Sequence, residues 1–122
     1  MDERNSVNTF DYIVKKYGIV NLEPIVNLSL TRYRLSILFK ELRYRIGAEI
    51  GIGRGVYSSS LCYDNPGVKL YCIDPWKVYD GYADCTEQIA LDADYVAAKE
   101  KLEPYDCEII RKFSMDAVKD FE

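Results

Sequence analysis

The chain has 122 residues, of which 48% are hydrophobic and 30% charged, so it is expected to form one packed domain or part of one. The formal net charge of −4 argues against a protein that mainly binds nucleic acid or an anionic membrane. The chain contains no histidine, which excludes Ser-His-Asp and Cys-His catalysis, histidine-ligated zinc and a histidine-bound haem.

The four cysteines form no C-x-x-C pair and lack the spacing of a zinc site. Cys72 and Cys107 lie in apolar runs typical of buried strands, where a free thiol behaves as a small hydrophobic residue. Reduced thiols are typical of the cytoplasm. The first ten residues lack the features of a signal peptide, and no run approaches the roughly 18 apolar residues of a membrane span. We therefore expect a cytoplasmic chain with no metal site and no membrane contact.

Two amphipathic helices are predicted within an N-terminal helical segment at residues 1–45. The first ends at Gly18 and has apolar side chains at spacings of three and four, namely Phe10, Ile13, Val14 and Tyr17. The second covers about residues 27–45, with Leu28, Leu35, Leu38 and Leu42 at helical spacings. Its outer face is basic, but the acidic segment at residues 74–108 can pair with these charges, so a solvated face is favoured over RNA contact.

From residue 46 onward the sequence alternates between strand and helix patterns. Strands are predicted from Ile46, at 68–73 and at 107–110; helices are predicted at 56–63, through Leu91 to Leu102, and from Ser114, which has the position of an N-cap. This alternation predicts a Rossmann-like, doubly wound α/β fold, of which three parallel strands are about the first half. The first strand would have one bare edge, so we expect a missing C-terminal half or a second copy of the chain to cover it.

The stretch from Glu49 to Gly55, E-I-G-I-G-R-G, is the strongest indication of a binding site. Its glycines, Gly51, Gly53 and Gly55, let the backbone turn sharply and approach a ligand between a strand and a helix N-terminus. Asp74 ends the next strand, at the position where a doubly wound sheet hydrogen-bonds a ribose diol. Together these features favour ligand binding over a turn that serves packing only.

The spacing of the glycines distinguishes between nucleotide ligands. A dinucleotide-binding turn, G-x-G-x-x-G, would need glycine where this chain has Val56, and Glu49 would repel a pyrophosphate. The G-x-G-x-G turn preceded by an acid resembles motif I of class I S-adenosylmethionine-dependent methyltransferases. The stretches K-L-Y-C-I-D-P-W (69–76) and I-I-R-K-F-S-M-D-A-V (109–118) look like those of the small bacterial and phage enzymes of the methyltransferase-24 kind. The similarity covers about residue 28 to the end of the chain.

This resemblance implies a role for each matching position. Glu49 and the glycines of the turn would hold the methionine moiety of the cofactor, and Asp74 would bind the ribose hydroxyls. Pro75 and Trp76 would flank the adenine, and Phe113 and Ser114 would lie at its edge. Ser58 would either hydrogen-bond the carboxylate of the cofactor or cap its helix. Trp76 has an alternative role as a core or interface anchor.

The resemblance also implies an activity. Residues 46–122 would form the S-adenosylmethionine-binding half of a methyltransferase, truncated before its fourth strand, with an acceptor that is a small molecule or sugar methylated at oxygen. Substrate-binding and catalytic residues of that family lie mostly in later strands, so no catalytic residue is assigned. Two alternatives remain: a non-catalytic cofactor-binding or assembly module, and an NAD- or nucleotide-binding Rossmann domain, which Val56 and Glu49 disfavour.

Overall fold

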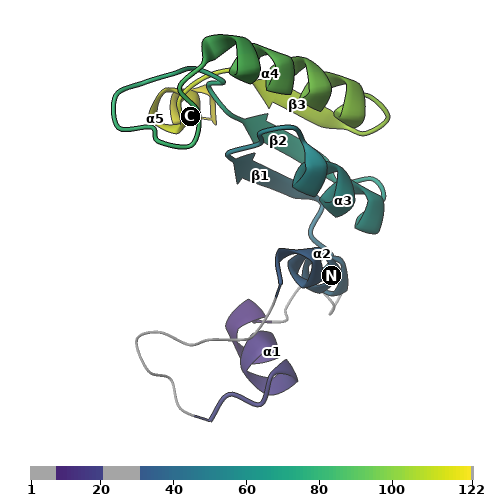
Figure 1. Ribbon diagram of the computed structural model, residues 1–122. Helices are drawn as coiled ribbons and strands as arrows, with labels where there is room; N and C mark the ends of the chain where they lie inside the picture. The colour runs from purple at the N-terminus through teal and green to yellow at the C-terminus, as the bar shows by residue number, and fades with distance from the viewer. Residues whose placement is uncertain (1–7, 21–30, 122) are drawn as a thin grey trace. The chain divides into compact units, whose positions relative to one another are not determined.

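The computed structural model describes residues 8–20 and 31–121 (Figure 1). The elements are, in chain order, α1 (Thr9–Lys16), α2 (Arg32–Glu41), β1 (Ile46–Ile50), α3 (Val56–Asp64), β2 (Lys69–Ile73), α4 (Gln88–Leu102), β3 (Cys107–Ile110), α5 (Ser114–Ala117) and the 3₁₀ helix η2 (Val118–Phe121). The chain divides into two compact units between Thr31 and Arg32, and each is described by itself.

The first unit contains α1, the predicted short helix. The side chain of Asn8 caps it, because Asn8 Oδ1 accepts hydrogen bonds from the N–H groups of Phe10 at 2.9 Å and Asp11 at 3.3 Å. Gly18 follows the helix with a φ of +59°, as expected for a glycine at a helix end.

The second unit contains α2, although the predicted N-terminal segment at residues 1–45 included this helix. The predicted helix over residues 27–45 is shorter in the structure, at Arg32–Glu41, and residues 27–30 lie outside the described residues. α2 is attached to the end of α3 through buried polar contacts: the side chain of Asn65 donates to the carbonyls of Ser36 at 2.9 Å and Leu61 at 3.0 Å. The hydroxyl of Ser36 also hydrogen-bonds the carboxylate of Asp64.

The second unit is built on an open, all-parallel sheet of three strands in the order β1-β2-β3. Ala48 of β1 pairs with Tyr71 of β2, and Tyr71 pairs with Glu108 of β3. The α/β alternation predicted from the sequence is therefore confirmed, with helices α3 and α4 as the crossovers. Among the described residues β1 is an edge strand, also as predicted.

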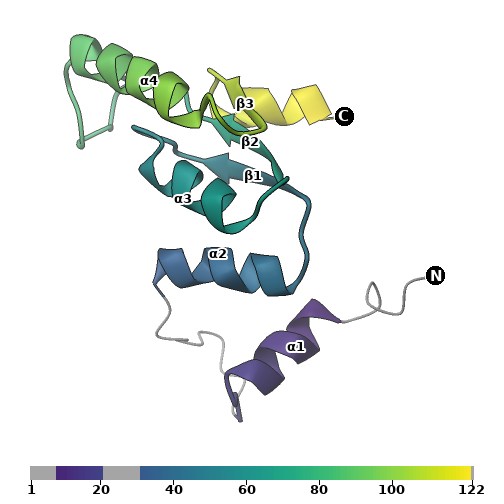
Figure 2. The ribbon, with the colours of Figure 1, turned by 90° about the vertical axis from the view of Figure 1, so that its right-hand side faces the viewer.

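The core lies between one face of the sheet and the helices α3 and α4 (Figure 2). Leu70 and Cys72 of β2 point into it and are 1% and 0% exposed. The intervening Tyr71 points to the opposite face, where its ring meets Phe121 of η2 edge-on, with the ring centroids 4.9 Å apart. Within the second unit, η2 therefore covers part of the second face, through the contact of Phe121 with Tyr71.

One predicted cap is wrong. Ser114 is the first residue of α5, and the N-cap position belongs to Phe113, whose side chain makes no capping hydrogen bond. A serine ahead of a helical pattern commonly caps the helix, but here the helix begins at Ser114 itself, so the cap position falls one residue earlier.

Candidate functional site

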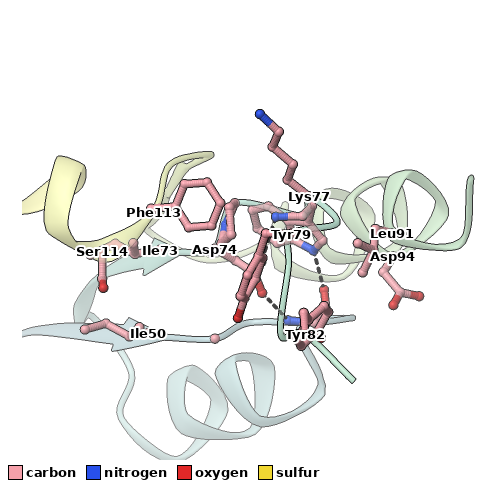
Figure 3. Close-up of a pocket in the computed structure, with 14 residues that line it drawn as sticks. Ile50, Ile73, Asp74, Lys77, Tyr79, Tyr82, Leu91, Asp94, Phe113 and Ser114 are labelled. Atoms are coloured by element: carbon pink, nitrogen blue, oxygen red, sulfur yellow. Dashed lines mark hydrogen bonds between the residues drawn. The ribbon is translucent and has the colours of Figure 1, made fainter. Parts of the chain in front are cut away.

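A cavity of about 250 Å³ lies at the carboxyl ends of β1 and β2, where open α/β sheets bind ligands (Figure 3). The glycine turn and the residues that follow β2 form its walls. Seven of the ten predicted site residues line it, namely Gly51, Gly53, Asp74, Pro75, Trp76, Phe113 and Ser114. The other three, Glu49, Gly55 and Ser58, are not among the lining residues.

The glycine turn presents bare backbone to the cavity. Gly51 and Gly53 have φ angles of +84° and +57°, a region that side chains of L-residues rarely adopt. A Cβ atom at either position would meet no other atom within 4 Å, so the space beside them is open. A ligand in the cavity can therefore approach the backbone of the turn closely.

The carboxylate of Asp74 holds this turn in place. Its Oδ2 accepts hydrogen bonds from the backbone N–H groups of Ile52 at 2.8 Å and Gly53 at 3.0 Å. Its Oδ1 accepts one from the N–H of Trp76 at 2.8 Å. A carboxylate offers about four acceptor positions, so about one remains, on Oδ1. The N–H groups of the turn thus point at a carboxylate of the protein and not into an empty anion site.

Trp76 also holds the turn, through a hydrogen bond to the carbonyl of Gly53. Its indole Nε1–H donates to the carbonyl of Gly53 at 2.9 Å, and its ring meets the ring of Tyr95 edge-on, with centroids 5.0 Å apart. The side chain is 1% exposed, which fits the core-anchor alternative better than a free adenine platform. Its φ of +42° is unusual for a residue other than glycine, and such backbone strain costs about 1–3 kcal/mol.

The loop after Trp76 is fastened to the start of α4. The side chain of Gln88 accepts from the N–H of Val78 at 3.0 Å and donates to the carbonyl of Trp76 at 2.8 Å. Asp92, one turn further along α4, accepts from Gln88 at 2.9 Å and from Arg111 at 2.6 Å. These contacts fix the wall of the cavity that follows β2.

Two tyrosines on this loop form an aromatic cluster with Phe113 that was not predicted from the sequence. The rings of Tyr79 and Tyr82 stack with centroids 5.0 Å apart, and Tyr79 meets Phe113 edge-on at 5.5 Å. All three residues line the cavity, whereas Lys77 extends away from them (Figure 3). The i, i+3 spacing of the two tyrosines directly after the acidic end of β2 was the signal in the sequence.

Glu49 and Ser58 form a pair on the face of the sheet that α3 covers. The hydroxyl of Ser58 donates to Glu49 Oε2 at 2.5 Å, and Ser58 is fully buried, so it neither caps α3 nor lines the cavity. Burial raises the pKa of the Glu49 carboxyl above its ordinary value, and this outweighs the hydrogen bond from Ser58 and the charge of Arg32, which both lower it.

The raised pKa of Glu49 predicts a pH-dependent stability. The folded chain binds the proton of Glu49 more tightly than the unfolded chain does, so protonation of Glu49 stabilises the fold. This stabilisation is complete below about pH 4.5, the pKa in the unfolded chain, and is lost as the pH rises through the higher pKa of the folded chain. Glu49→Gln keeps the acceptor for Ser58 and carries no charge. We expect its melting temperature relative to wild type to increase with pH above about 4.5. Thermal denaturation at several pH values checks this, with the exposed Glu100→Gln as the control; equal curves for the two variants would contradict it.

Gly55 serves packing. It occupies the N-cap of α3, and a Cβ there would lie 3.3 Å from the Cα of Ala98 on α4. The third glycine of the motif therefore brings α3 and α4 together, whereas the third glycine of a dinucleotide-binding turn brings a helix close to a strand.

Within residues 8–20 and 31–121, no helix is long and apolar enough to cross a membrane. The same residues contain no group of three or more acidic or cysteine side chains placed to hold a metal ion. Comparison with known proteins gave no match to a protein-family model, a curated protein or a solved structure.

Proposed function

We propose that the chain binds S-adenosylmethionine in the cavity beside the glycine turn and is the cofactor-binding portion of a class I methyltransferase. The proposal combines the motif resemblance with the position of the cavity at the carboxyl ends of parallel strands. It includes a small-molecule or sugar acceptor, methylated at oxygen, and a cytoplasmic location.

The observation that carries the proposal is the contact between Asp74 and the glycine turn. A phosphate bound at such a turn needs the free backbone N–H groups, but those of Ile52 and Gly53 already point at Asp74. The carboxylate would also repel a phosphate placed beside it. A cofactor with a positively charged sulfonium and amino group suits this electrostatic environment, which disfavours NAD.

The remaining features of the cavity suit a nucleoside. The acceptor position left on Asp74 Oδ1 can take a ribose hydroxyl. The rings of Tyr79 and Phe113 offer apolar surface for a purine, whereas Trp76 supports the turn from within the core. Glu49 contacts Ser58 outside the cavity, so the backbone of Gly51 and Gly53 is left to face the methionine moiety.

When bound, the cofactor would supply a methyl group on sulfonium, whose carbon an acceptor oxygen could attack in line, with S-adenosylhomocysteine as the leaving group. The described residues bind and orient: Asp74 fixes the turn and the ribose, and the aromatic side chains exclude water from the purine. Positioning of this kind can supply much of the acceleration of a displacement reaction. We assign no residue to removing a proton from the acceptor.

The test is calorimetric titration of the 122-residue chain with S-adenosylhomocysteine and, separately, with NAD. We expect S-adenosylhomocysteine to bind and NAD to show no binding. Asp74→Ala should weaken S-adenosylhomocysteine binding by about 1.5–3 kcal/mol, the range for hydrogen bonds to a charged group, or roughly 10- to 150-fold. Asp74→Asn, which keeps one acceptor oxygen for the turn, should fall between wild type and Asp74→Ala.

Asp106→Ala is the matched control, because Asp106 is an exposed carboxylate at the opposite end of the sheet, where it pairs with Lys69. Its affinity should equal that of wild type. Binding of NAD, binding of neither ligand by the folded chain, or an unchanged affinity in Asp74→Ala would each count against the proposal. An assembly module is the second candidate, and the open edge of β1 favours it.

A further inference from the structure

Two cysteine thiols from distant parts of the chain meet between α3 and β3. The Sγ atoms of Cys62 on α3 and Cys107 on β3 lie 3.5 Å apart, and both cysteines are free. Cys62 is buried, with an exposed fraction of 3%, whereas Cys107 is half-buried. Neither thiol lines the cavity of the candidate cofactor site, so the proposed function gives this pair no role.

The pair can be reached from solvent. A cavity of about 480 Å³ lies at the amino ends of β2 and β3, and Cys62 is one of the residues that line it. Its wall also includes the exposed Tyr63 and Asp106, so the cavity opens to the surface. A molecule as small as hydrogen peroxide can therefore approach the two sulfur atoms while the core stays folded.

We propose that Cys62 and Cys107 form a site of reversible oxidation, where hydrogen peroxide joins α3 to β3 through a disulfide. The peroxide oxidises the Cys107 thiol to a sulfenic acid and releases one water. The Cys62 sulfur then attacks the sulfenic sulfur and forms the S–S bond, while the thiol proton leaves with the hydroxyl group as a second water. The two thiols together lose two hydrogen atoms, and the peroxide is reduced to water.

The surroundings of the two thiols assign the order of these steps. The thiolate is the form of cysteine that a peroxide attacks. Burial raises the pKa of the Cys62 thiol to about 12, so this thiol is protonated near neutral pH. The more exposed Cys107 therefore reacts first, and Cys62 acts as the resolving thiol because its sulfur is already in contact with that of Cys107.

The competing partner for Cys107 is Cys72, which also interacts with it in the core. In the parallel pairing of β2 with β3, Cys72 lies opposite Ile109, two residues beyond Cys107. With strands about 4.8 Å apart and a rise of about 3.3 Å per residue, the Cα atoms of Cys72 and Cys107 are about 8 Å apart. A disulfide needs a Cα separation below about 7 Å, so Cys62 is the favoured partner.

The disulfide would stabilise the fold. It would close a loop that contains β2 and α4, and so reduce the conformational entropy of the unfolded chain. The sulfur atoms have to approach by about 1.5 Å to reach the bond length, which is within the reach of side-chain rotation. We expect oxidation to raise the melting temperature by about 10 °C or more.

Peptide mapping after peroxide treatment of the full chain tests the pairing. A Cys85→Ser background removes the remaining thiol, and trypsin then places Cys62, Cys72 and Cys107 in separate peptides, at residues 55–69, 70–77 and 102–111. Without reduction, mass spectrometry should detect peptide 55–69 linked to peptide 102–111. Dithiothreitol should release the two peptides.

Thermal denaturation in the same background tests the effect on stability. The melting temperature should rise by about 10 °C or more after peroxide treatment and return to its starting value with dithiothreitol. Cys107→Ala should show neither the link nor the rise, and Cys72→Ala, the matched control, should show both. Circular dichroism checks that each variant is folded before oxidation.

Three results would overturn the proposal. They are free thiols at Cys62 and Cys107 after peroxide treatment, a link that runs through Cys72, and a melting temperature that oxidation leaves unchanged. None of these measurements includes a cofactor, so their outcome is independent of whether the chain binds S-adenosylmethionine.

Discussion

Replacing Gly53 with valine is expected to weaken S-adenosylhomocysteine binding by about 100-fold or more. The φ of +57° at this position costs an L-residue about 1–2 kcal/mol, and a β-branched residue is especially disfavoured there. If the valine keeps this conformation, its side chain enters the open space beside the turn; if it does not, the hydrogen bonds to Asp74 are lost. A combined loss near 2.7 kcal/mol corresponds to about 100-fold in affinity.

Gly67→Val separates backbone strain from loss of the site. Gly67 has a φ of +85° and open space around its Cβ position, but it lies in the turn before β2 and does not line the cavity. Calorimetry should show normal affinity in Gly67→Val and an affinity lower by about 100-fold or more in Gly53→Val, while thermal denaturation shows both destabilised. Normal binding by Gly53→Val would mean that the ligand site lies elsewhere.

Replacing Trp76 with alanine is expected to lower the free energy of unfolding by about 3–5 kcal/mol, the range for removing a buried large aromatic side chain. The loss includes the edge contact with Tyr95 and the hydrogen bond to the carbonyl of Gly53. Urea denaturation followed by circular dichroism measures it, because Trp76 is the only tryptophan and fluorescence is lost with it.

Trp76→Phe separates the contribution of the hydrogen bond to Gly53 from that of the buried ring. It keeps most of the apolar surface but removes the indole N–H, so it should cost about 1–3 kcal/mol, the range for leaving a buried polar group unpaired. A loss below about 1 kcal/mol in Trp76→Ala would contradict the anchoring role and favour the adenine-flanking one.

The fold of the second unit could be predicted from the sequence because the patterns that indicate its strands and helices are local. Alternating strand and helix patterns predicted the parallel sheet and the edge position of β1, and the glycine turn predicted the location of the cavity. The helix ends were less well defined, since Ser114 lies inside its helix and α2 is shorter than its apolar pattern.

The parts of the site that escaped prediction depend on contacts between distant residues. Nothing in the sequence indicates that Glu49 turns toward Ser58 on α3, because which face of a sheet a helix covers is decided by packing. The stacking of Tyr79 on Tyr82 depends on a loop that Gln88 fastens from α4, ten residues after Val78. Likewise the sequence predicts that Asp74 binds ribose but does not indicate that backbone N–H groups occupy most of its acceptor positions.

The hydrogen bonds of Asp74 also limit which ligands this cavity could bind. One side chain sets both the charge of the cavity and the shape of the turn, so the two properties cannot be altered separately. Removing the carboxylate to admit a phosphate would release the very amides that must be held in place to bind it. Evolution or engineering toward an anionic nucleotide would therefore require a second substitution that rebuilds the turn at the same time.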